Sequence, residues 1–310
     1  MTERPRHVLA TAAGVFVGAV TAVSCRAAPA RPPGPVASAL VATTAELGVD
    51  PVALVNAWGE LERIAARVAE HHGRSRGELI DDLTAVVFDE LAFVREVDSD
   101  DPRFFLLPTV LETRRGSCLG LGALYLIVAE RLDLPLDGVR VPGHFFVRTR
   151  GPRPRNIELL RRGETMPDAW YRQKYGPWPE ESPAYLRPLS MQQMGALFWF
   201  NAGNFARRRG DIARARRAYE RAVTEAPDFA EAHASLGLER QLEGDLPEAA
   251  RAYREAARAR ADLPGLNDNM ALLERELRPD MPASLGPPIP SPALPQSVTS
   301  SPSSSRRPSP

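Results

Sequence analysis

The feature that most limits the possible folds is a repetition near the C-terminus. Five small or aromatic residues recur in the same order 34 residues later: Gly203, Gly210, Ala215, Tyr219 and Ala222, then Gly237, Gly244, Ala249, Tyr253 and Ala256. Small residues at a fixed spacing let two antiparallel helices pack closely, and a tyrosine can fill the gap between them. Pro227 is placed to end the first unit. The sequence therefore predicts a helical array with units at about 201–227 and 228–261.

This period and pattern resemble the tetratricopeptide repeat (TPR). Two units are fewer than the roughly three that such an array usually needs for stability. Within a repeat region at 190–278, we therefore expect a helix at 266–277 to cap one end and the preceding domain to cap the other. Two roles remain open for the array: a groove that binds a protein or peptide partner, and an appendage that only stabilises the chain.

A second constraint is the long apolar segment that begins at Cys118. The segment 119–132 is longer than a strand, and Leu134-Pro135 would end it, so we predict a buried helix. Gly116-Ser117 precedes it as a turn. A cysteine at a helix N-terminus lies where backbone N–H groups and the helix dipole favour the thiolate. Cys118 is therefore a candidate nucleophile.

Candidate partners for Cys118 follow in the sequence. After Pro142-Gly143, the run 144–149 has strand character and opens with His144; a second run, 156–160, contains Asn156 and Glu158. A helix packed on these strands would bring together a nucleophile, its base and an orienting carboxylate or amide. A single buried cysteine or histidine is more often structural. The joint placement of the two favours a site.

This arrangement resembles the transglutaminase-like fold, which many cysteine proteases share. The segments Arg-Gly-Ser-Cys-Leu-Gly-Leu at 115–121 and Pro-Gly-His-Phe-Phe-Val-Arg at 142–148 are similar to those of the bacterial SirB-type subgroup, in which TPR-like helices follow the core. The similarity covers roughly residues 40–260. It implies a mostly helical α+β fold, in which a transglutaminase-like domain at 38–189 packs its cysteine-bearing helix on a small antiparallel sheet.

The resemblance also implies a chemistry. Cys118 would attack an amide carbonyl, and His144 would take its proton and later protonate the leaving amine. Glu158 stands at the family's third position, where aspartate is common, and Asn156 could orient the imidazole instead. We further expect Gly116 and Gly120 to leave room for a substrate backbone. The implied class is a cysteine protease or amidase, or a transglutaminase-like acyl transferase, acting on a protein or peptide.

The first 25 residues predict an export signal. Arg4 and Arg6 precede an uncharged apolar run at 8–23, which is short for a membrane span but suits a secretory signal. Ser24-Cys25 resembles a lipobox, in which the cysteine is diacylated and anchors the protein to a membrane. Cleavage after Ala28 and an uncleaved anchor remain open. All three outcomes place the domains outside the cytoplasm, in the periplasm or at the membrane.

The prediction of export bears on the chain's two cysteines. If Cys25 is acylated or removed with the signal, Cys118 has no disulfide partner. A free thiol in an oxidising compartment favours a nucleophile over a structural residue. Residues 26–37 are predicted as a proline-rich linker that would hold the folded part off a membrane.

Composition limits the other possibilities. A length of 310 residues with zero formal net charge and 44% hydrophobic residues predicts about two globular domains with tails and gives no reason to expect a nucleic-acid partner. No pattern predicts a cofactor or metal: His71 and His72 would point apart on a helix, and the acidic segment 98–101 fits no EF-hand loop. The Pro/Ser-rich residues 279–310 are expected to be disordered.

The rest of the chain is predicted from local patterns. Apolar spacing predicts helices at 38–47, 51–71 and 76–94. Residues 161–187, rich in Pro, Trp and Tyr, are predicted to be irregular and either to cover the cleft or to pack between domains. Two functional classes remain: an exported thiol enzyme, and a non-catalytic scaffold that presents the repeats to a partner.

Overall fold

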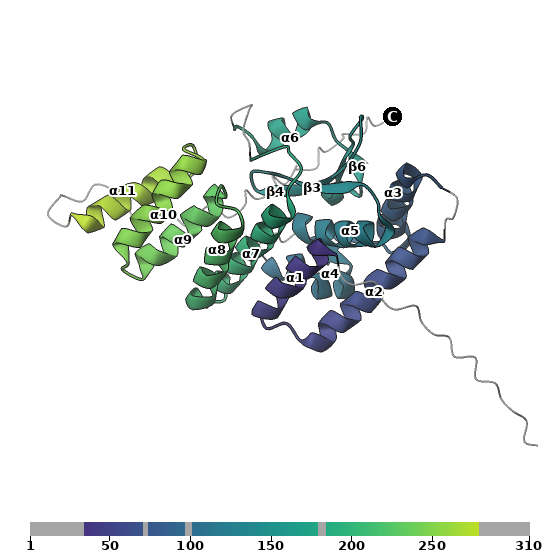
Figure 1. The fold of residues 1–310 in the computed structure, drawn as a ribbon, viewed down its shortest axis with the longest axis horizontal. Helices are drawn as coiled ribbons and strands as arrows, with labels where there is room; N and C mark the ends of the chain where they lie inside the picture. The colour runs from purple at the N-terminus through teal and green to yellow at the C-terminus, as the bar shows by residue number, and fades with distance from the viewer. Residues whose placement is uncertain (1–33, 71–73, 97–100, 179–183, 279–310) are drawn as a thin grey trace, which may run out of the picture. The chain divides into compact units, whose positions relative to one another are not determined.

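The structure is a computed structural model that describes residues 34–70, 74–96, 101–178 and 184–278 (Figure 1). Several predictions concern residues outside these ranges. They are the signal at 1–25 with its possible lipidation site Cys25, the linker as far as residue 33, the pair His71-His72, the acidic residues Asp98 and Asp100, and the tail at 279–310.

The described chain begins with three helices: α1 (Pro35–Glu46), α2 (Pro51–Ala69) and α3 (Arg76–Ala85). The helix α1 starts inside the predicted linker, because a proline fits the first helical position, where its missing N–H is not needed. The helix predicted at 76–94 ends early. It widens into a π-helical turn, η1 (Val86–Glu90), and the left-handed conformation of Ala92 then turns the chain into a strand.

That strand starts a short parallel pair in front of the cysteine. Strand β1 (Val94–Arg95) pairs with β2 (Arg115–Gly116). Between them lie a 3-10 turn, η2 (Pro102–Phe105), and the helix α4 (Leu107–Thr113). The pair thus joins the segment that leads into Cys118 to the chain that follows the N-terminal helices.

The central helix α5 (Cys118–Leu132) is apolar all round, and every residue from Leu119 to Ala129 is buried. It packs against a four-stranded antiparallel sheet of strand order β3-β4-β5-β6. The strands are β3 (Leu136–Val141), β4 (His144–Thr149), β5 (Asn156–Glu158) and β6 (Glu164–Thr165). This confirms the predicted mostly helical α+β core.

The opposite face of the sheet is covered by a helix that the sequence analysis did not predict. Within the supposedly irregular segment 161–187, residues Asp168–Tyr175 form α6 (Figure 1). Its Tyr171 joins Val139 and Phe146 of the sheet in a separate apolar cluster. Between β5 and β6, residues Leu159–Arg161 form a 3-10 turn, η3. The prediction of an irregular segment is therefore wrong over α6.

The repeats follow as α7 (Met191–Arg208), α8 (Ile212–Glu225), α9 (Ala230–Leu242) and α10 (Leu246–Ala259). A β-carbon at Gly203 would meet the ring of Tyr219 at 2.4 Å, and one at Gly237 would meet Tyr253 at 2.7 Å, so these small residues pair with the tyrosines as predicted. The helix α11 (Leu266–Leu277) packs on α10. The first repeat helix starts well before residue 201 because Ser190 and Gln193 form a capping box there.

No linker separates the core from the repeats within the described residues 184–278. Helix α7 packs against α1 and against η2 of the core. One continuous apolar core runs from Val36 to Ala232, and a second cluster fills the space between the last three helices.

Position 120 requires a glycine because α5 crosses η2 closely there. A β-carbon there would lie 2.2 Å from the carbonyl oxygen of Phe104 and 2.8 Å from Cγ2 of Val110. That carbonyl also accepts a hydrogen bond of 2.8 Å from the Ser117 N–H, so it cannot easily move. At Gly116 a β-carbon would meet Leu121 at 2.9 Å. The expectation that these glycines leave room for a substrate is therefore wrong.

We expect Gly120→Ala to lower the free energy of unfolding by about 2–3 kcal/mol, because the added methyl group must displace backbone. Gly59→Ala in α2 is the matched control. There the nearest atom is the flexible Nη1 of Arg63 at 3.7 Å, and the helix should gain about 0.5–1 kcal/mol. Urea denaturation of the two variants measures both values, and equal effects would contradict the close crossing.

Candidate functional site

The site begins at the N-terminus of α5. Ser117 caps the helix by accepting a hydrogen bond of 3.2 Å from the Gly120 N–H. Cys118 is therefore the first helical residue, and it is half-buried with a free thiol. The backbone N–H groups of a first helical turn have no partner within the helix; here the cap takes that of Gly120, and that of Cys118 is left to a ligand.

His144 reaches this helix end from the start of β4. Gly143 adopts a left-handed conformation, with φ of 69°, and closes the turn that pairs His144 with Val141. The imidazole Nε2 lies 2.7 Å from Oε2 of Glu158. The side chains of His144 and Glu158 are only 2% and 1% exposed. The pair is thus removed from water.

The strand register explains why Glu158 is the residue that meets the imidazole. Asn156 lies opposite Arg148, so the chain of β5 runs from there toward the His144 end of β4. Glu158 is the last residue of β5, and its Oε1 accepts a hydrogen bond of 3.0 Å from the Leu160 N–H. Both carboxylate oxygens are therefore held in place.

The charge of His144 depends on both neighbours. Burial is the largest influence and lowers the pKa of the imidazole, but the Glu158 charge and hydrogen bonds to Cys118 and Glu158 together raise the pKa to about 9. At neutral pH both ring nitrogens then carry protons. Nε2 donates one of them to Glu158. The structure thus joins His144 to Glu158 and places Cys118 near enough to the imidazole to raise its pKa.

Aromatic rings from α6 cover the imidazole. The Tyr175 ring stacks on His144 with centroids 4.5 Å apart and planes 5° from parallel, and Tyr171 lies 6.2 Å away. The Tyr171 hydroxyl is buried. Burial and the nearby Glu158 charge raise the pKa values of both tyrosines, so the two phenols stay neutral. Neither contact was predicted from the sequence, although the spacing of four residues between the two tyrosines would place them on one face of a helix.

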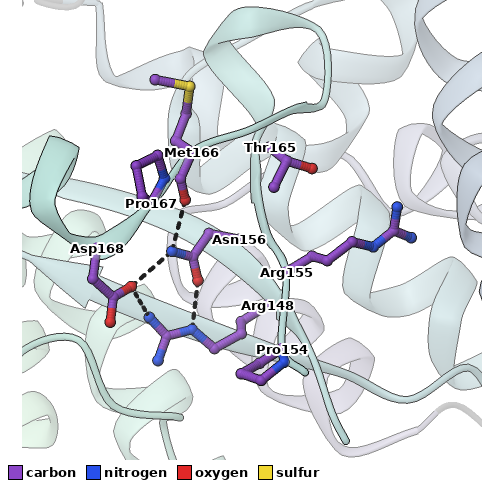
Figure 2. Close-up of a pocket in the computed structure, with 8 residues that line it drawn as sticks. All are labelled: Arg148, Pro154, Arg155, Asn156, Thr165, Met166, Pro167 and Asp168. Carbon is purple, nitrogen blue, oxygen red and sulfur yellow. Dashed lines mark hydrogen bonds and ion pairs between the residues drawn. The ribbon is translucent and has the colours of Figure 1, made fainter. Parts of the chain in front are cut away.

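Asn156 lies in a different environment. Its amide donates to the Met166 carbonyl at 2.9 Å and to Asp168 at 2.7 Å, and its oxygen accepts a bond of 2.6 Å from Arg148 (Figure 2). These residues line an open pocket of about 350 Å³. His144 is not among them, so the structure does not bring Asn156 to the imidazole.

Two absences concern only the described parts of the chain. No three His, Cys, Asp or Glu side chains there lie close enough together to hold a metal ion. None of the helices in these ranges is both long and apolar enough to cross a membrane.

Comparison with families of known sequence gives two matches. The family model described as the transglutaminase-like superfamily matches residues 56–196, and that of the tetratricopeptide repeat matches residues 196–229. The predicted domain types are therefore confirmed.

Individual relatives extend these matches. The chain is 31% identical to a UPF0162 protein of Pseudomonas aeruginosa (strain PAO1) over 245 residues, which cover 70% of this chain and 88% of that protein. It is 41% identical to a UPF0162 protein of Xylella fastidiosa over 73 residues, 20% of this chain and 26% of that one. Among solved structures it is similar to menin, with a TM-score of 0.39, 12% identity and coverage of 78% of this chain and 69% of that one.

Proposed function

The chain belongs to the UPF0162 family and carries a transglutaminase-like domain followed by a tetratricopeptide repeat, and from that premise we propose that it is a thiol enzyme that cleaves or transfers an amide acyl group. The observation that carries the proposal is the buried pair of His144 and Glu158, joined at 2.7 Å, with Cys118 at the start of α5 beside the imidazole. This is the arrangement of a nucleophile, its acid–base partner and an orienting group.

The proposed reaction has two halves. The Cys118 thiolate attacks the carbonyl carbon of an amide, and the new C–S bond forms as the carbonyl π electrons move to oxygen. When the tetrahedral intermediate collapses, the C–N bond breaks and imidazolium His144 gives its proton to the leaving amine. Water or an amine then attacks the thioester, His144 takes its proton, and the thiolate leaves. Water gives hydrolysis, and an amine gives a new amide.

The remaining residues have supporting roles in this proposal. Glu158 fixes the imidazole in the plane that faces Cys118 and stabilises its positive charge. The backbone N–H of Cys118, at the start of α5, would donate to the developing oxyanion. Tyr175 limits rotation of the imidazole by stacking on it.

We also propose the setting of the enzyme. The motifs at 115–121 and 142–148 support membership of the SirB-type subgroup, and the sequence at 1–25 supports export, with a lipid anchor on Cys25. Tetratricopeptide repeats commonly bind proteins, which supports a protein partner on α7 to α11. A scaffold without catalysis is the second candidate, favoured by the near-complete burial of His144 and Glu158.

Alkylation of Cys118 tests the proposal without a known substrate. The full chain with Cys25→Ser has Cys118 as its single thiol, and iodoacetamide labelling is followed from pH 5.5 to 9. An imidazolium-paired thiolate should react at pH 6 on the order of 10–100 times faster than in His144→Gln, because a free thiol titrates near about 8.5. Glutamine keeps most of the volume of histidine and can still donate to Glu158.

Either result decides between the two candidates. Fast labelling at pH 6 that is lost in His144→Gln supports the enzyme. Labelling that rises with pH like a free thiol in both proteins would favour the scaffold.

A further inference from the structure

We propose that Arg95 and Lys174 form an anion-binding mouth beside Cys118, which selects peptide substrates with a carboxylate next to the scissile amide. The inference rests on the proposed thiol chemistry and adds the class of substrate. It is carried by the placement of two cations near Cys118, His144 and Glu158, by the absence of a described carboxylate partner for either cation, and by the aromatic rings beside Lys174.

Arg95 lies on the strand that borders the cysteine. In the parallel pair of β1 and β2, Arg95 lies opposite Gly116, the residue before the Ser117 cap. Strand β1 also contacts η3, the turn that directly follows Glu158. Arg95 therefore lies between the segment that leads into Cys118 and the segment that leads out of Glu158. Its side chain is exposed.

Lys174, the chain's one lysine, lies on α6. Its Nζ lies 4.6 Å from the centre of the Trp170 ring and 5.2 Å from that of Tyr175. The Tyr175 ring that this ammonium group contacts also stacks on His144. Lys174 is exposed, so an incoming substrate can reach it.

These two cations are not neutralised by the described part of the chain. Neighbouring Arg115 is paired with Glu96 at 2.7 Å, and Arg161 with Glu164 at 2.6 Å, but neither Arg95 nor Lys174 makes an ion pair with a described carboxylate. Burial is the largest influence lowering the pKa of Lys174, and repulsion from Arg161 and Arg95 adds to it against attraction by Glu158. The cations therefore repel one another at the mouth and would gain from a bound anion.

The chemistry of the mouth fits an acidic peptide. In an unmodified peptide the anionic groups are the side chains of Asp and Glu and the terminal carboxylate. Trp170, half-buried beside Lys174, offers an apolar face to the stem of such a side chain. Unpaired positive charge at the entrance also raises the local concentration of an anionic substrate.

Two alkylating reagents of similar size but different charge test the positive charge at the mouth directly. Iodoacetate carries a carboxylate and iodoacetamide is neutral, so the ratio of their rates at Cys118 reports the potential at the mouth. In the full chain with Cys25→Ser at low ionic strength, we expect this ratio to fall roughly threefold in Arg95→Gln and in Lys174→Gln, and about tenfold in the double variant. Added salt should lower the ratio in the wild type.

Matched variants separate charge from shape. Arg95→Lys and Lys174→Arg keep the charge and should keep the ratio, which a merely disturbed site would not. Arg254→Gln removes an exposed cation from α10 of the repeats and should leave the ratio unchanged. Three small ligands that slow the alkylation of Cys118 to different extents distinguish the two kinds of carboxylate. N-acetyl-glutamate α-amide carries only a side-chain carboxylate, and N-acetyl-glutamine carries only a terminal one. N-acetyl-glutamine amide is the neutral control.

The outcomes are distinct from those of the proposed function. If Cys118 reacts as an activated thiol but the ratio is the same in the double variant as in the wild type, the anion-binding mouth is wrong and the thiol chemistry stands. Equal ratios in the charge-retaining and charge-removing variants would also overturn it. If Cys118 reacts only as an ordinary thiol with both reagents, both proposals fall.

Discussion

Glu158→Ala is expected to lower the free energy of unfolding by about 3–5 kcal/mol at neutral pH. The substitution leaves the buried, charged imidazole of His144 without its partner at 2.7 Å. It also removes the acceptor of the Leu160 N–H. Urea denaturation at pH 7 measures the loss.

A surface pair provides the control for this prediction. Glu164 forms an ion pair with Arg161, but the two side chains are 54% and 48% exposed, so Glu164→Ala should cost less than about 1 kcal/mol. Losses of similar size in the two variants would mean that the His144–Glu158 pair is not the buried, coupled unit described above.

The same position separates the two candidates for the orienting group. We expect Glu158→Gln to remove the fast labelling of Cys118 at pH 6, since a neutral amide cannot hold the imidazolium charge. Asn156→Ala should keep the fast labelling, because the Asn156 side chain bonds to Arg148, Asp168 and Met166 rather than to His144. The opposite pattern would reassign the role to Asn156.

Stability is expected to fall by up to about 3 kcal/mol as the pH rises from 6.5 to 9. The pKa of His144 is raised from 6.5 to about 9, so the folded protein holds the proton more tightly than the unfolded chain does. Its contribution is therefore complete below pH 6.5 and is lost as the pH passes through about 9. Urea denaturation at pH 6, 7.5 and 9 measures how the free energy of unfolding changes with pH.

Glu158→Gln is the control for this pH dependence. It removes the charge that raises the pKa of His144, so most of the slope between pH 6.5 and 9 should disappear. His233 does not interfere, because burial lowers its pKa and its effect falls below pH 6.5. A slope that persists unchanged in Glu158→Gln would assign the pH dependence to another group.

The strongest local signals were sufficient for the framework of the fold. The uninterrupted apolar run after Ser117 predicts a buried helix, and the 34-residue repetition predicts the pairing of Gly203 with Tyr219. Both features depend on spacing within one or two neighbouring elements. The placement of Cys118 at a helix start and His144 at a strand start follows from the same local patterns.

The site could be predicted only in part, because its completion depends on contacts between distant segments. Choosing between Asn156 and Glu158 requires the register of β5 on β4, which no local pattern sets. Strand β3 was missed because Asp137 and Gly138 interrupt its apolar pattern, although the strand is buried by α5 and α6. Helix α6 was missed because prolines on both sides of it suggested irregular chain, so the stacking of Tyr175 on His144 could not be foreseen.

The helix α7 has a consequence for how this protein can be divided. The matched transglutaminase-like and tetratricopeptide segments meet at residue 196, which lies inside α7 rather than in a loop. A fragment cut there would strip the core of Phe198 and Ala202, both fully buried. The two modules are therefore not separable where their sequence matches meet: an exchange of repeats between relatives would have to keep α7 and restore the buried residues that extend the core to Ala232.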